Sequence, residues 1–228
     1  MARLERNGVS AIEFQDVSKR YGNRTVLSRL SFQIERGERI AIHGPSGSGK
    51  TTVLRLLAGF ATPDEGVVRI ANRDVAANGK LLVEPDTRNL GMVFQDLALW
   101  PHMTVYQNLE FALKAQSLAA ELRKQRIDEV LARVRLAESG GAYPARLSGG
   151  QQQRVAIARA LVAQPLALLM DEPLSNLDDD LKDELCAHLL DLHSQLGFTL
   201  VYVTHSKEEM RRIGTRTILL RDGKEVPV

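Results

Sequence analysis

The residues best suited to chemistry form one glycine-rich run that ends in lysine and threonine. The run fits the spacing G-x-x-x-x-G-K-[ST] and consists of Gly44, Pro45, Ser46, Gly47, Ser48, Gly49, Lys50 and Thr51. Its three glycines let backbone N–H groups converge on one anion, and the positive end of a following helix points at the same place. Lys50 adds a charge near the β- and γ-phosphates, and the Thr51 hydroxyl suits Mg²⁺. The run therefore predicts a binding site for a triphosphate and Mg²⁺, with Thr52 as a further contact.

The chain on either side of this run has the pattern that such a site requires. Residues 39–43 are apolar enough for a short buried strand, and residues 52–58 predict a helix that ends at Gly59. A glycine-rich turn with a solvated lysine is the alternative. It does not explain why the lysine and threonine stand in register between a strand and a helix.

A pair of carboxylates, Asp171 and Glu172, follows the most hydrophobic run of the chain at residues 166–170. We expect this run to be a central parallel strand, so the pair emerges at the sheet edge where a phosphate loop lies. Asp171 is then a candidate partner of Mg²⁺, and Glu172 a candidate to orient or deprotonate the attacking water. A solvated Asp-Glu pair is common, and this one gains weight from its position in the chain.

Composition limits the class of protein. The chain has 228 residues, 44% of them hydrophobic and 25% charged, which is typical of one large globular domain. The net charge is +2 with scattered Lys and Arg, which gives little support for a nucleic-acid surface. No apolar run approaches the length of a membrane span, and residues 1–6 lack the apolar core of a secretory signal, so we expect a cytoplasmic protein. The single cysteine, Cys186, is expected to be an inert, half-buried thiol.

Hydrophobic periodicity predicts the remaining elements. Further strands are expected at residues 12–17, 30–34, 66–70, 90–94, 199–204 and 217–220, with a turn at residues 21–23 and a loop at residues 76–88. Helical patterns cover residues 105 to about 135, 152–163 and 181–196. The first two helical segments interrupt an otherwise α/β pattern.

Five consecutive residues stand between the glycine-rich run and the carboxylate pair: Leu147, Ser148, Gly149, Gly150 and Gln151. They resemble the signature motif of nucleotide-binding subunits of ABC transporters. The resemblance covers nearly the whole chain and includes Tyr21 as the adenine-stacking aromatic, Gln95 as the Q-loop glutamine, Ser175, Asn176, Leu177 and Asp178 as the D-loop, and His205 as the switch histidine. The signature and the glycine-rich run are jointly highly specific, whereas Tyr21, Gln95 and His205 would each be unremarkable alone. We expect His43, His188 and His193 to be structural histidines.

The resemblance implies an α/β fold with a P-loop NTPase core of mainly parallel sheet, an antiparallel β subdomain and a helical subdomain. One ABC ATPase domain would cover residues 1–228. Its antiparallel β subdomain would take about 11–36 and 66–74, its core about 37–65, 88–95 and 164–228, and its helical subdomain about 96–163.

The family's mechanism, carried onto these residues, implies an ATPase that uses ATP and Mg²⁺. Gln95 would couple the helical insertion to Mg²⁺ and water, and His205 would hydrogen-bond the γ-phosphate. Ser148 begins a helix with the two following glycines, which makes a second anion-binding end. The resemblance implies that two subunits pair head to tail, as a homodimer or with a related ATPase subunit, and that each phosphate loop faces the other subunit's signature.

Partners and location follow from the same resemblance. The expected partners are transmembrane permease subunits, with a substrate-binding protein if the transporter is an importer, and no nucleic acid. Residues 143–154 and 171–178 resemble bacterial import ATPases, which favours import over export. The subunit would then be cytoplasmic and peripheral on the inner face of the membrane, bound through its permease. A non-transport regulatory ATPase bound to a membrane partner is the alternative. A chromosome-maintenance ATPase would need a long coiled-coil insertion, and a small-molecule kinase leaves the signature unexplained.

The segment that follows Gln95, residues 97–103, is apolar without a strand or helix period and holds the only tryptophan, Trp100. Two interpretations stand at nearly even weight. Leu97 and Trp100 can fill the joint between the core and the helical insertion. Alternatively, Leu99, Trp100 and Met103 can line a groove that accepts a short helix of the permease.

Overall fold

The computed structural model describes residues 10–114, 116 and 118–227. The strands are β1 Ser10–Tyr21, β2 Arg24–Glu35, β3 Arg39–His43, β4 Glu65–Ile70, β5 Arg73–Ala77, β6 Lys80–Leu81, β7 Leu90–Val93, β8 Ala167–Asp171, β9 Thr199–Thr204, β10 Arg216–Arg221 and β11 Lys224–Val226. The helices are α1 Lys50–Ala58, α2 Val105–Leu113, α3 Ala120–Arg133, α4 Gly149–Leu161, α5 Asp179–Leu196 and α6 Lys207–Ile213, with short 3-10 turns at Pro85–Thr87, Ala137–Ser139 and Pro144–Arg146. Residues 1–6, used above to judge a secretory signal, lie outside the described part of the chain.

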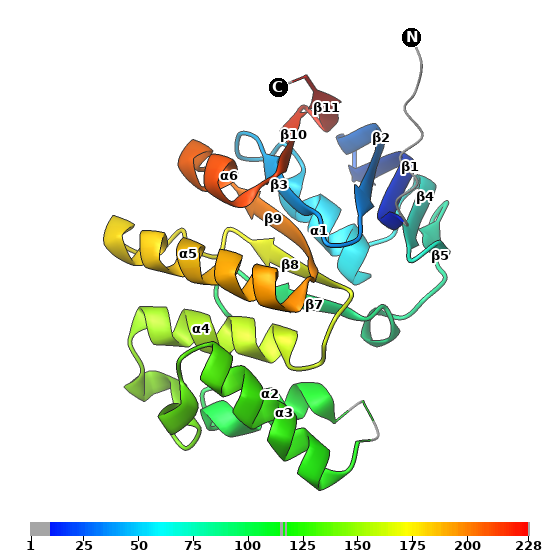
Figure 1. The fold of residues 1–228 in the computed structure, drawn as a ribbon. Helices are drawn as coiled ribbons and strands as arrows, with labels where there is room; N and C mark the ends of the chain where they lie inside the picture. The colour runs from blue at the N-terminus through cyan, green and yellow to red at the C-terminus, as the bar shows by residue number, and fades with distance from the viewer. Residues whose placement is uncertain (1–9, 115, 117, 228) are drawn as a thin grey trace.

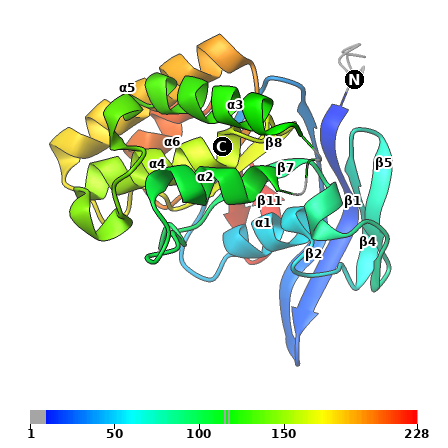
Figure 2. The ribbon, with the colours of Figure 1, turned by 90° about the horizontal axis from the view of Figure 1, so that it is seen from below.

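The strands form two sheets. One is antiparallel in the order β2-β1-β4-β5-β6, and the other has the order β11-β10-β3-β9-β8-β7, in which every pairing except β10 with β11 is parallel. In Figure 1 the antiparallel sheet lies at the upper right, helices α2, α3 and α4 lie at the bottom, and the parallel sheet lies between them. The view from below in Figure 2 also shows the antiparallel sheet apart from helices α2, α3 and α4.

The parallel sheet separates two hydrophobic clusters, because alternate residues of its central strands face opposite sides. Leu168 and Met170 of β8 face the cluster that contains residues of α2 to α6. Ala167 and Leu169 face the other cluster, which contains α1 and the antiparallel sheet. All five residues of β8 are buried, as its unbroken apolar run predicts for a strand covered on both faces.

Two hairpins are absent from the sequence-based prediction, and each turns at a dipeptide ending in glycine. Residues 76–88 were expected to be loop, but the chain pairs β5 with β6 around Asn78 and Gly79, which have φ angles of 47° and 81°. Likewise β10 pairs with β11 around Asp222 and Gly223, with φ angles of 49° and 72°. Asn-Gly and Asp-Gly favour tight hairpin turns because both residues tolerate positive φ.

The helical segment also differs from its prediction. The single pattern over residues 105–135 is divided into α2 and α3, which contact each other and α4. Residues 114–119 contain neither proline nor glycine, so nothing in the sequence marks the break. Thr104 begins α2 with a capping box, in which its hydroxyl accepts from the N–H of Gln107 while the Gln107 side chain accepts from the N–H of Thr104.

A buried arginine, Arg88, joins α1 to the antiparallel sheet. Its guanidinium donates to the carbonyls of Leu56 and Leu57 at the end of α1, each at 2.7 Å. It also donates to the carbonyls of Val75 at 3.1 Å and Val83 at 3.0 Å. Burial lowers the pKa of Arg88, and the four carbonyls compensate the guanidinium for lost water.

The three histidines expected to be structural each contact a backbone carbonyl; for His43, of intermediate burial, it is that of Thr204, 3.2 Å from Nδ1. His188 and His193 are buried and hydrogen-bonded to the backbone carbonyls of Arg133 and Gly37, and burial lowers the pKa of both. Burial raises the pKa of Cys186 to about 11, so its thiol is unreactive, and it is fully rather than half buried. Within the described ranges, no helix has both the length and the apolar character needed to cross a bilayer.

Candidate nucleotide site

The glycine-rich run connects the end of β3 to the start of α1, and two of its glycines lie where a side chain could not. A Cβ on Gly44 would lie 2.2 Å from the carbonyl oxygen of Leu220. A Cβ on Gly49, which has a φ of 106°, would lie 2.6 Å from Leu27 and 2.9 Å from the carbonyl of Val26. The loop therefore packs directly against β10 and β2, and only glycine permits this close approach.

Lys50 is only 5% exposed and lies beneath the loop. Its ammonium donates to the carbonyl oxygens of Gly44 at 2.8 Å and Pro45 at 3.1 Å. Beside it, the hydroxyl of Ser48 is buried without a hydrogen-bond partner among the described residues. A buried cation beside an unpaired donor is a favourable environment for an anion, because the anion would satisfy both.

The end of one strand, β8, brings the acidic pair to the same loop. Asp171 ends β8, and its Oδ1 accepts a hydrogen bond from the Thr51 hydroxyl at 3.2 Å. Burial raises the pKa of the Asp171 carboxyl, while the Thr51 hydrogen bond opposes that rise. A buried carboxylate with one hydroxyl partner has lone pairs left for a cation, so Thr51 and Asp171 together form a candidate Mg²⁺ site.

Glu172 lies between a lysine and a histidine. Its Oε1 is 3.9 Å from the Lys50 ammonium, and its Oε2 is 3.0 Å from Nδ1 of His205. Its backbone has a φ of 45°, a left-handed conformation that is uncommon for a residue other than glycine, and its N–H donates to the carbonyl of Val203. Strained backbone of this kind is concentrated at functional sites, where surrounding structure holds a side chain in place.

An open cleft of about 290 Å³ covers this cluster. It is lined by Tyr21, Arg24, Val26, Ser46, Gly47, Gly49, Lys50, Thr51, Thr52 and Glu172. Arg24 and Val26 were not predicted from the sequence. No local pattern marks them, because they join the site only through the packing of β2 against Gly49.

Several other predicted site residues do not line this cleft. None of Gln95, Ser148, Gly149, Gly150, Gln151 and Asp178 is among the residues that line it. Ser148 begins α4 as predicted, in a capping box with Gln151, and Asp178 begins α5, where its Oδ1 accepts from the N–H of Leu181 at 3.0 Å. Gln95 is exposed, two residues beyond β7. The chain thus gathers the phosphate loop, Asp171, Glu172 and His205, and leaves the signature elsewhere.

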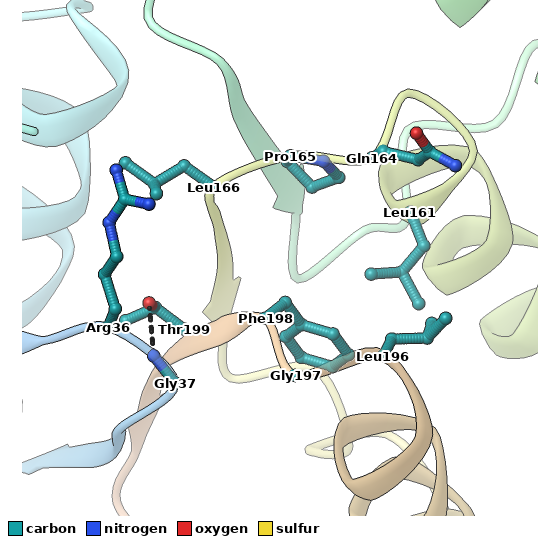
Figure 3. A pocket seen from close by; sticks show the side chains of 10 residues that line it. All are labelled: Arg36, Gly37, Leu161, Gln164, Pro165, Leu166, Leu196, Gly197, Phe198 and Thr199. Atoms are coloured by element: carbon teal, nitrogen blue, oxygen red, sulfur yellow. Dashed lines mark hydrogen bonds between the residues drawn. The ribbon is translucent and has the colours of Figure 1, made fainter.

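A second hollow, of about 350 Å³, lies at the opposite ends of the strands (Figure 3). Its walls include Leu161, Leu196 and Phe198, and the N–H of Gly37 donates to the Thr199 hydroxyl at its edge. Among the residues that the structure describes, no carboxylate lines it. Because ligands of open α/β sheets bind outside the carboxyl ends of the strands, the cleft beside Lys50 is the better nucleotide site.

Comparison with known proteins finds relatives among ABC transporter proteins. The model of the ABC transporter family matches residues 27–175. The spermidine/putrescine import ATP-binding protein PotA of Pseudomonas aeruginosa is 45% identical over 213 residues, which are 93% of this chain and 57% of that protein. The probable sulfate/thiosulfate import ATP-binding protein CysA of Chlorella vulgaris is 40% identical over 218 residues, which are 96% of this chain and 90% of that protein.

Among solved structures, the dimeric structure of MJ0796, a bacterial ABC transporter cassette, matches with a TM-score of 0.82 and 36% identity. The match covers 95% of this chain and 97% of that one. The chain spans little more than half the length of the polyamine relative, at 57%, but nearly all of the solved cassette.

Proposed function

The chain belongs to the ABC transporter family, and from that premise we propose that it binds and hydrolyses ATP to drive substrate import across a membrane. The observation that carries the proposal is the position of Glu172, held between Lys50 and His205 at the edge of the nucleotide cleft. The relatives are named as import proteins, which supports import and disfavours the alternative of a non-transport regulatory ATPase. Relatives of similar identity are named for different cargoes, so identity alone assigns no cargo to this chain.

ATP fits the cleft by charge and by shape. Backbone N–H groups of the run from Gly44 to Thr52 would bind the phosphates, with the Lys50 ammonium beside them. The unpaired Ser48 hydroxyl and the space left by the glycines support an anion at this position. Tyr21, which lines the cleft and is 45% exposed, would offer its ring to the adenine base.

Mg²⁺ would be held by Thr51 and Asp171, and Gln95 would complete the site after the helical region moves toward it. Mg²⁺ usually takes only one or two protein ligands and fills its remaining positions with phosphate oxygens and water. When bound, it neutralises the charge that develops on the transferred phosphoryl group.

Hydrolysis needs a base, and Glu172 is the candidate. Its carboxylate would accept a proton from the attacking water as the new bond to the γ-phosphorus forms and the bond to the β–γ bridging oxygen breaks, which yields ADP and phosphate. His205 holds the other carboxylate oxygen through Nδ1 and is 60% exposed, so its ring can also reach a γ-phosphate. Lys50 stays close enough to stabilise charge on the phosphates.

We infer that a second chain completes each site. The signature at Ser148 presents the free N–H groups of the α4 N-terminus, yet it does not line its own chain's cleft. A head-to-tail pair would place the signature of one chain over the phosphate loop of the other. The partner is a second copy or a related ATPase subunit.

Phosphate release tests the activity directly. The purified chain with ATP and Mg²⁺ should release phosphate, and chelation of Mg²⁺ by EDTA should abolish that release. Asp171→Asn should need a higher Mg²⁺ concentration for half-maximal rate, because it removes the carboxylate that faces the ion. Release that is unaffected by EDTA would contradict the proposed Mg²⁺ role, and no release at any protein concentration would contradict the ATPase.

The proposed permease contact lies on both sides of Gln95 in the sequence. Phe94 stacks on Phe60, which is 58% exposed, with ring centroids 6.3 Å apart. Trp100 packs on Phe111, which is 44% exposed, with centroids 4.4 Å apart. Exposed aromatic residues suit a partner helix, and their position beside Gln95 would connect permease movement to the nucleotide. Through this contact the subunit would be cytoplasmic, on the inner face of the membrane, and an importer would also use a substrate-binding protein.

The segment after Gln95 combines the two roles considered for it. Leu97 and Leu99 pack against the larger hydrophobic cluster, and the Leu97 carbonyl accepts from Arg159 of α4 at 2.7 Å, which is the role of filling the joint. Trp100 lies between Phe111 and the Arg159 guanidinium, 5.0 Å from its ring centroid. Trp100 and Phe111, rather than Leu99, therefore carry the proposed contact.

We expect Phe111→Asp to keep the fold and ATP hydrolysis of the isolated chain but to abolish co-purification with the permease and substrate uptake. The substitution places a charge at the centre of an apolar contact, where truncation of one aromatic anchor costs about 2 kcal/mol or more. Leu122→Asp is the matched control, because Leu122 is 39% exposed on the neighbouring helix α3. Normal assembly and uptake by Phe111→Asp would place the permease contact elsewhere.

A further inference from the structure

A buried carboxylate, Glu209 of α6, lies behind the histidine that contacts Glu172. Glu209 is only 8% exposed. Its Oε2 accepts two hydrogen bonds, from the Tyr202 hydroxyl at 2.8 Å and the Thr204 hydroxyl at 2.9 Å. Burial and the adjacent Glu209 hold the pKa of Tyr202 well above its usual range, so Tyr202 remains a donor.

A capping box at the start of α6 would give this side chain a different partner. Ser206 begins α6, and its hydroxyl accepts from the N–H of Glu209 at 3.3 Å. In a complete capping box the glutamate at this position would bind the N–H of the serine. Here the N–H of Ser206 donates instead to the Thr204 hydroxyl at 3.0 Å, and the Glu209 side chain turns into the core. A carboxylate is costly to bury, so its diversion from an available local partner indicates a role within this network.

The network holds the chain on both sides of His205. The Thr204 hydroxyl donates to Glu209 and accepts from Ser206, so the residues before and after His205 are connected through one carboxylate. Tyr202 connects the same carboxylate to the middle of the buried strand β9. The backbone of His205 is therefore held in place on both sides. Its exposed ring extends from there, and Nδ1 lies 3.0 Å from Glu172 Oε2.

We propose that Glu209 is a positioning residue, which acts through Thr204 and Ser206 to hold His205 against Glu172. The effect of Glu209 on hydrolysis rests on the proposed function, whereas its effect on the position of His205 does not. Loss of the Glu209 carboxylate would allow the His205 backbone to move. A small displacement of a group at the reaction site lowers the rate strongly.

Glu209→Met tests the proposal, because methionine has similar length and no acceptor for the two hydroxyls. We expect kcat for ATP to fall about tenfold or more, since positioning is lost, while KM stays within about twofold because the phosphate loop is unchanged. Glu209→Gln keeps an acceptor oxygen and should restore most of the rate. Glu208→Met is the matched control, because Glu208 is the exposed neighbour on the same helix. In the double variant with His205→Ala, the loss should equal that of His205→Ala alone, because Glu209 acts through His205.

A second measurement does not depend on activity. Side-chain ¹H–¹⁵N spectra of the histidines, with His205 assigned from His205→Gln, should show the His205 signals shifted in Glu209→Met and no longer sensitive to Glu172→Gln. If Glu209→Met fails to fold, Thr204→Val removes the bridging hydroxyl and should give the same spectral change. Unchanged His205 signals in a folded variant would overturn the proposal. Absence of ATP hydrolysis in the unaltered chain would instead overturn the proposed function, and the spectra would still decide the role of Glu209.

Discussion

Glu172→Gln should bind ATP with unchanged affinity and hydrolyse it about 10²- to 10⁴-fold more slowly, the range expected when a general base is removed. The amide keeps the shape of the side chain and its contact with His205, but it cannot accept a proton from water. The phosphate loop and the Thr51–Asp171 pair are untouched, so binding persists. Titration calorimetry would measure the affinity, and phosphate release under saturating ATP would measure the rate.

The same variant should accumulate as an ATP-bound dimer on gel filtration, because the step that would separate the two chains is blocked. Glu138→Gln, an exposed glutamate in the short turn Ala137–Ser139, is the control for loss of one negative charge. Ordinary turnover by Glu172→Gln would remove Glu172 from the role of base and leave His205 or a water network to supply it.

Ser148→Arg should lower the ATPase activity of an unaltered chain that is paired with the variant. Ser148 begins α4 at the end we place over a second chain's phosphate loop, and an arginine there would block that face. If hydrolysis needs both sites of a pair, an equal mixture of variant and unaltered chain should have roughly a quarter of the activity of the same total amount of unaltered chain, because only pairs of two unaltered chains then have two complete sites. Independent monomers would retain half of it. Ser148→Ala removes the cap without the bulk, and the cap itself is worth about 1 kcal/mol.

The unaltered chain alone supplies a further check on this pairing. If two chains complete each site, the rate should rise faster than linearly with protein concentration at dilutions where the pair dissociates. Strict proportionality at all dilutions would indicate a self-sufficient monomer.

The sequence predicted the glycine-rich loop between a strand and a helix better than it predicted several of the elements around it. The phosphate loop is one continuous segment, so its conformation depends mainly on its own eight residues. The Glu172–His205 contact joins residues 33 positions apart, yet it was foreseeable, because both follow buried strands of a parallel sheet whose ends meet at one edge. Arg24 and Val26 were missed because their relation to the loop depends on how β2 packs against Gly49, which no local pattern states.

The errors in secondary structure have two physical origins. The two missed hairpins turn at Asn78-Gly79 and at Asp222-Gly223, respectively. Both dipeptides favour hairpin turns, but a flanking strand of each hairpin is too short to show a clear alternation of apolar and polar residues. The division between α2 and α3 has no such mark, because tertiary packing of both helices on α4 decides it. The diversion of Glu209 from a local cap into the core likewise depends on tertiary partners, Tyr202 and Thr204.

Arg88 limits how far α1 and the antiparallel sheet can move relative to each other. One side chain holds the end of the phosphate-loop helix to the sheet that carries Tyr21, through four carbonyls on three segments of the chain. Relative rotation of α1 and that sheet would break several buried hydrogen bonds at once, so the two move as a rigid unit. We therefore expect the distance between the Tyr21 ring and the phosphate loop to be set when the chain folds and to stay constant when a ligand binds or leaves. If the chain drives transport as proposed, we expect the accompanying movement on the other side of the parallel sheet, where α2, α3 and α4 lie.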